Sequence, residues 1–179
     1  MKASTTVALT LIALLVVSGC QKNQGAVVGD ITDPPEAFYP HETVQLHQSV
    51  EWAGLRIDVK SVGASVGKDI RDIDLMVNVV YVNQGPEDLR PPTDVRFEYG
   101  FHPYPAAPKG QVRLADGRYV DGPIPAGMSA EGSITGTLVG AAHSDPPSGD
   151  EMRDIVLRSA LMFGQGSSQV TVPFEEPAR

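Results

Sequence analysis

The side chains that most often perform catalysis or bind metals are scattered in this sequence. The 179-residue chain holds four histidines, His41, His47, His102 and His143. No two of them have the i, i+2 strand spacing or the i, i+4 helix spacing that metal sites commonly use. The serines of Gly166-Ser167-Ser168 lack a nearby His, and no Gly-x-Ser-x-Gly motif is present. We therefore expect no catalytic residue, no bound metal and no cofactor.

An acidic cluster precedes one of the apolar segments. Asp69, Asp72 and Asp74 lack the Asp-x-Asp-x-Asp-Gly spacing of a calcium loop, and Lys68 and Arg71 are interleaved with them. Two interpretations stay open, a partial cation site and a solvated strand entrance that discourages edge pairing. The spacing favours the solvated entrance.

The chain has a single cysteine, Cys20, and it directly follows an apolar segment. The run from Val7 to Val17 has 11 residues, too few for the roughly 20 of a membrane-spanning helix. It fits the core of a secretory signal, with Lys2 before it and small residues after it. Residues 1–19 are therefore predicted to be a signal peptide, and one cysteine excludes an internal disulfide framework.

The four residues Val17-Ser18-Gly19-Cys20 resemble the lipobox of bacterial lipoproteins. This resemblance implies cleavage after Gly19, a diacylglyceryl group on the Cys20 thiol, and a fatty acid such as palmitate on the new amine. Two or three acyl chains hold a protein stably at a membrane. Gln21 stands where an Asp usually signals retention in the inner membrane, so we expect an outer-membrane lipoprotein if the bacterium is Gram-negative.

The segment 20–41 contains scattered Gly and Pro without apolar periodicity, and it is predicted to be a linker. Removal of the signal takes Lys2 and no acid, leaving 13 basic and 22 acidic residues and a net charge of −9. An acidic chain is unsuited to nucleic acid and is repelled by anionic lipids. Attachment is therefore expected to depend on the acyl chains at Cys20.

The remaining segment, 42–176, is rich in turns and β-branched residues. All 15 prolines and 17 of the 18 glycines follow residue 19. Alternating apolar residues predict strands within 44–52, 55–60, 73–82, 95–99, 111–120, 129–139, 155–163 and 170–174. Only 151–156 is predicted as a helical turn. Seven to nine short strands with frequent turns indicate an all-β antiparallel sandwich.

Several short motifs resemble the immunoglobulin-like domains of unknown function found in bacterial lipoproteins and secreted antigens. They are Met76-Val-Asn-Val-Val-Tyr-Val-Asn83, Leu114-Ala-Asp-Gly-Arg-Tyr119 and Ile124-Pro-Ala-Gly-Met-Ser-Ala-Glu-Gly132, after Leu55-Arg-Ile-Asp-Val59. The resemblance covers about 43–174 and implies an immunoglobulin-like fold. It provides no catalytic residues.

One segment departs from that family pattern, the proline-rich insertion from Phe101 to Lys109. Aromatic residues on a stiff proline-rich loop suit partner recognition, so Phe101, His102 and Tyr104 form a candidate partner loop. The alternative is that these aromatics cover the open end of the core, and we favour it because loop aromatics more often complete a core. Trp52 is likewise expected to fill the core.

These features predict a lipid-anchored protein of the cell envelope that acts as a non-enzymatic interaction or accessory module, with an envelope protein as partner. A small-molecule or metal-ion-binding envelope lipoprotein is the alternative, and it requires a concave pocket with convergent polar groups. An envelope hydrolase is the third class, and it requires a catalytic group assembled from residues distant in sequence.

Overall fold

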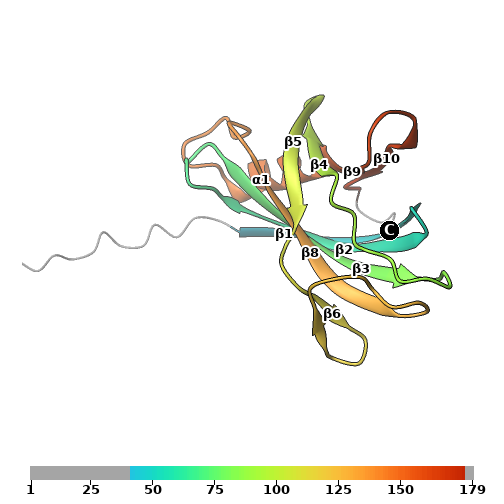
Figure 1. Cartoon of the computed structure of the whole chain (residues 1–179). Helices are drawn as coiled ribbons and strands as arrows, with labels where there is room; N and C mark the ends of the chain where they lie inside the picture. The colour runs from blue at the N-terminus through green and yellow to red at the C-terminus, as the bar shows by residue number, and fades with distance from the viewer. Residues whose placement is uncertain (1–40, 176–179) are drawn as a thin grey trace, which may run out of the picture. The chain divides into compact units, whose positions relative to one another are not determined.

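The computed structural model describes residues 41–175, and the regular structure of this part of the chain is mostly β-strand (Figure 1). Its strands and helices are β1 His41–Trp52, β2 Leu55–Val66, β3 Ile73–Asn83, β4 Val95–Tyr99, β5 His102–Pro108, β6 Val112–Leu114, β7 Tyr119–Val120, β8 Ser129–Leu138, α1 Gly149–Leu157, β9 Ser159–Phe163, the short helix η1 Gly166–Ser168, and β10 Val170–Pro173. The predicted all-β antiparallel sandwich is confirmed, with ten strands rather than seven to nine.

The ten strands form one hydrogen-bonded sheet in the order β1-β2-β3-β8-β5-β4-β9-β10, and β6 pairs with β7 and β8. Every pairing is antiparallel. The sheet bends between β8 and β5, so that β1, β2, β3 and β8 face β5, β4, β9 and β10. The two ends of the order, β1 and β10, also approach each other.

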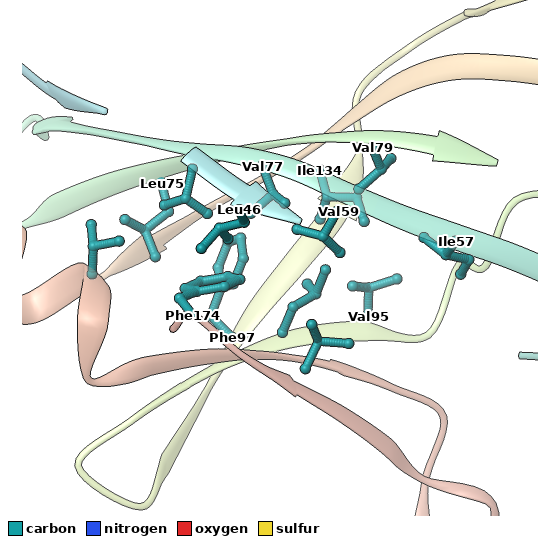
Figure 2. Packing of buried hydrophobic residues seen from close by; sticks show 14 of the residues in the cluster. Leu46, Ile57, Val59, Leu75, Val77, Val79, Val95, Phe97, Ile134 and Phe174 are labelled. Atoms are coloured by element: carbon teal, nitrogen blue, oxygen red, sulfur yellow. The ribbon is translucent and has the colours of Figure 1, made fainter. Parts of the chain in front are cut away.

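The core lies between these two layers and follows directly from the alternation in sequence. In β3, Ile73, Leu75, Val77, Val79 and Tyr81 are all buried, as their spacing predicts. Phe97 from β4 and Phe174 after β10 lie opposite Leu75 and Val77 (Figure 2), with their ring centroids 6.2 Å apart. Trp52 is half-buried against this core, 6.4 Å from Phe163.

The bend of the sheet depends on a glycine in β8. Gly136 pairs with Ala106 of β5, and a Cβ atom on Gly136 would lie 2.5 Å from the carbonyl oxygen of Pro105 and 3.0 Å from the Phe97 ring. No other residue fits there without displacing backbone. Gly136 therefore allows β5 to cross close to β8 and join the two layers.

The loop after β3 is held by one buried side chain. Asn83 is fully buried, and its Nδ2 donates to the carbonyls of Glu87 (2.7 Å) and Ile124 (2.9 Å). Its Oδ1 accepts from the backbone N–H of Gly85 at 3.0 Å. This asparagine ties the loop after β3 to the turn before β8, so its role here is structural.

Two segments differ from the sequence expectation. The proline-rich insertion predicted as a loop is strand β5, and the helical turn predicted at 151–156 is a longer helix, α1. As a result, Ile155 and Leu157 belong to this helix and not to the strand expected from 155 onward. Helix α1 buries Met152, Ile155 and Val156, which repeat at helical spacing.

Candidate functional site

The turn between β4 and β5 presents an aromatic side chain to solvent. Tyr99 pairs with His102, so Gly100 and Phe101 form a two-residue hairpin loop, with φ angles of 58° and 66°. Two successive positive φ angles are the mark of a type I′ turn, which favours Asn or Gly. Phe101 is 94% exposed. The chain thus holds an exposed phenylalanine in a left-handed conformation that costs about 1–2 kcal/mol.

Two prolines stiffen the strand that supports this tip. Pro103 lies opposite Glu98 and Pro105 opposite Arg96. Because the residues flanking a two-residue turn exchange backbone hydrogen bonds, the alternate positions 103 and 105 direct their nitrogens away from β4. Proline has no N–H to lose at such positions. The segment can therefore be a strand, and near the tip, at 103 and 105, its outer edge is blocked against pairing with another strand, whereas residues 106–108 pair with β8 on that edge.

The three residues of the candidate partner loop occupy different environments. Phe101 and His102 are exposed at the tip, whereas Tyr104 lies opposite Phe97 and packs against the core. The core-cover interpretation therefore holds for Tyr104 and is wrong for Phe101. Only the tip itself is available to a partner.

Beside Phe101 lies a groove of about 510 Å³, which we call the tip groove. It is lined by Glu98, Tyr99, Gly100, Phe101, His143, Arg158 and Ala160. Pairing of β4 with β9 brings these distant segments together, because Tyr99 lies opposite Ser159 and Glu98 opposite Ala160. The groove thus joins the hairpin tip to the start of β9.

The third side of the tip groove is fixed by the start of helix α1. The Ser148 side chain caps this helix by accepting from the Glu151 N–H at 3.1 Å. The Glu151 carboxylate accepts from the backbone N–H groups of His143 (2.5 Å) and Ser144 (3.2 Å), and also from the Ser144 hydroxyl. These hydrogen bonds, the Ser144 hydroxyl first, lower the pKa of Glu151 and fix the position of His143.

The charges around the tip groove are of both signs. Arg158 pairs with Asp154 at 3.0 Å, but its side chain remains 69% exposed, and Glu98 contributes the opposite charge from β4. Burial raises the pKa of the Tyr99 hydroxyl, and the nearby positive charge of Arg158 lowers it to a smaller degree. Tyr99 therefore stays neutral, and the groove combines an aromatic wall with a cation and an anion.

Residues 41–175 contain no group of three or more His, Cys, Asp or Glu side chains that would hold a metal ion. The acidic cluster instead caps local backbone and hydroxyl groups. Asp69 accepts from the Arg71 N–H (3.1 Å), Asp72 from the Gly140 N–H (2.9 Å), and Asp74 from the Thr137 hydroxyl (2.5 Å). The cluster thus stabilises the entrance to β3.

Cys20, the predicted lipid attachment site, and the signal and linker before His41 lie outside the described residues. Within the part that is described, no helix is long and apolar enough to span a bilayer.

Comparison with known proteins adds little to this picture. No protein-family profile and no curated protein matches the sequence. A functionally unknown protein from Listeria monocytogenes EGD-e is similar in structure, with 14% identity, coverage of 77% of this chain and 89% of that one, and a TM-score of 0.47. A conserved hypothetical protein from Bacillus anthracis has 9% identity, coverage of 75% and 97%, and a TM-score of 0.37. Neither similarity assigns a family or an activity.

Phe101 is a candidate from the sequence alone, whereas its neighbours in the groove are not. Glu98, His143, Arg158 and Ala160 come from three separate segments and share no spacing motif. The one usable signal was the Gly-Phe pair itself, because Gly100 between two alternating apolar runs marks a tight turn.

Proposed function

We propose that this protein is a lipid-anchored component of the bacterial cell envelope that acts as a non-enzymatic interaction module. Its anchor is the acylated Cys20, and its contact surface is the hairpin tip with Phe101 and the adjoining groove. The observation that supports this contact surface is the exposed Phe101 in a left-handed backbone conformation. Strain of this kind persists at sites where it serves a function.

The chemistry of the tip fits a contact role. Aromatic anchors seated in grooves dominate the binding energy of protein interfaces. The prolines of β5 reduce the entropy that is lost when a partner immobilises the tip. A small-molecule-binding lipoprotein remains the second candidate, because a groove of about 510 Å³ is within the usual size of ligand sites.

Crosslinking in intact cells tests the contact surface. A photoreactive residue at position 101 is expected to capture an envelope protein, and a photoreactive residue in place of Tyr119 is not. Tyr119 is the matched control because it is also aromatic and 65% exposed, but lies on the separate β6–β7 hairpin. Equal capture from both positions, or none from position 101, would contradict the proposal. A small molecule retained at the tip groove through purification would favour the second candidate.

The anchor is tested separately by labelling cells with a radioactive fatty acid. The wild-type protein should carry label and fractionate with membranes, and the Cys20→Ser variant should carry none. An unlabelled wild-type protein released into the medium would refute the lipid anchor. In a Gram-negative cell, Gln21 after Cys20 predicts recovery in the outer-membrane fraction.

A further inference from the structure

We propose that the partner of the hairpin tip is a second copy of this chain, bound across a two-fold axis beside Phe101. The inference rests on the proposed function, since it takes the tip as the contact surface. It adds the identity of the partner and the symmetry of the complex.

The first argument is geometric. An isologous dimer requires one patch that contains both a projecting group and the hollow that receives it. Phe101 projects at 94% exposure, and the tip groove, with Tyr99 and Ala160 in its lining, lies directly beside it. A two-fold axis between the projection and the hollow seats each Phe101 in the groove of the other copy. A single projection without an adjoining groove would instead require a different partner.

The second argument is the charge of the patch. The tip groove carries Glu98 and Arg158, one of each sign, and the Arg158 side chain stays 69% exposed although it also pairs with Asp154 of its own chain. In the proposed dimer, the axis that exchanges the Phe101 rings would bring Glu98 toward Arg158 of the partner subunit, and the reverse pair would follow by symmetry. This patch is therefore complementary to itself, although the mature chain, at −9, repels its own copies elsewhere.

The expected dimer is weak in solution and stronger at a membrane. Two seated phenylalanine rings bury about 300–500 Å² together, which is well below the 1,200–2,000 Å² of a stable interface. Copies held on one bilayer by their acyl chains meet at a much higher effective concentration. The contact is thus suited to a lipid-anchored protein, which does not need high affinity in solution.

Charge exchange provides the sharpest test. The full-length acylated protein is reconstituted in lipid vesicles, and energy transfer between labelled copies is measured over a series of surface concentrations, with the melting temperature of each variant measured in parallel. The wild type should dimerise, and Phe101→Ser should weaken the dimer at least tenfold. Each of Glu98→Arg and Arg158→Glu should also weaken it at least tenfold, because each brings like charges together. The double variant E98R/R158E should restore it, and Tyr119→Ser should leave it unchanged.

A wild type that remains monomeric at every concentration overturns the inference, as does a double variant that dimerises no better than the single ones. If the wild type is monomeric and a photoreactive residue at position 101 captures a different envelope protein, the inference fails and the proposed function stands. If neither dimer nor captured protein depends on Phe101, both fail.

Discussion

Replacement of Asn83 by alanine is expected to be the most destabilising change of a polar residue in the β-sandwich. Asn83 is fully buried at the end of β3 and makes three hydrogen bonds to the backbone, with Gly85, Glu87 and Ile124. Alanine removes all three hydrogen bonds at once, while the backbone groups of Gly85, Glu87 and Ile124 that took part in them remain.

The three losses are not equal. The Ile124 carbonyl also accepts from the Leu89 N–H at 3.1 Å, so it keeps a partner in the variant. The Glu87 carbonyl and the Gly85 N–H lose the side-chain partner, and both of these hydrogen bonds are partly buried. Since an unsatisfied buried group costs about 1–3 kcal/mol, we expect a loss of about 3 kcal/mol in the free energy of unfolding. For a domain of this size, that lowers the melting temperature by about 12 °C.

Urea unfolding of the wild type and three variants measures this effect. Asn78→Ala is the matched control, because Asn78 lies on the same strand but is exposed and makes one bond, to the Ser61 hydroxyl at 2.9 Å. It should cost less than about 1 kcal/mol. Asn83→Asp should be at least as destabilising as Asn83→Ala, because the carboxylate cannot donate and adds negative charge beside two carbonyls. An Asn83→Ala variant within 1 kcal/mol of Asn78→Ala would refute this reasoning.

Three further variants, one of them with a matched control, test other parts of the structure. Phe101→Gly should raise the melting temperature slightly. Glycine relieves about 1–2 kcal/mol of left-handed backbone strain, which outweighs its entropy cost of about 0.5–1 kcal/mol. A lower melting temperature would mean that Phe101 packs on the domain. Gly136→Ala should cost about 2–3 kcal/mol in chemical unfolding, because its Cβ would lie 2.5 Å from the Pro105 carbonyl oxygen, whereas Gly63→Ala, with its nearest atom at 3.8 Å, should be almost neutral. The pKa of Glu151 is lowered from 4.5 in the folded protein, so its contribution to stability is present above pH 4.5 and is lost as the pH falls through the folded value. In the Glu151→Gln variant, the free energy of unfolding should therefore fall less steeply between pH 5 and pH 3 than in the wild type. An equally steep fall in both proteins would show that the hydrogen bonds to His143 and Ser144 do not form.

The core strands could be predicted from the sequence because their alternation is local. Ile73 to Tyr81 alternate without interruption, and Asp116-Gly117 marks the turn between β6 and β7. Strand β5 was missed because prolines at alternate positions normally indicate a loop. They are compatible with a strand only where their nitrogens face away from the neighbouring strand, and that depends on the exact position of the turn at Gly100-Phe101.

Helix α1 was shortened in the prediction for a related reason. Ile155 and Leu157 continue the strand-like alternation of β9, so they were assigned to a strand. The helical spacing of Met152, Ile155 and Val156 was therefore overlooked. The tip groove could not be predicted from the sequence. It forms where β9 pairs with β4, and Arg158 and Glu98 are neighbours only because of that long-range pairing.

The short pairing between β5 and β8 has a mechanical consequence. A domain pulled at one end by the chain entering β1 and at the other by a partner on the hairpin tip carries the load across the ladders from β1 to β5. The ladders β1–β2, β2–β3 and β3–β8 each join ten or more residue pairs, whereas β5 and β8 share only Ala106–Gly136, Ala107–Thr135 and Pro108–Ile134. Under tension, the pairing between β5 and β8 is therefore expected to break first.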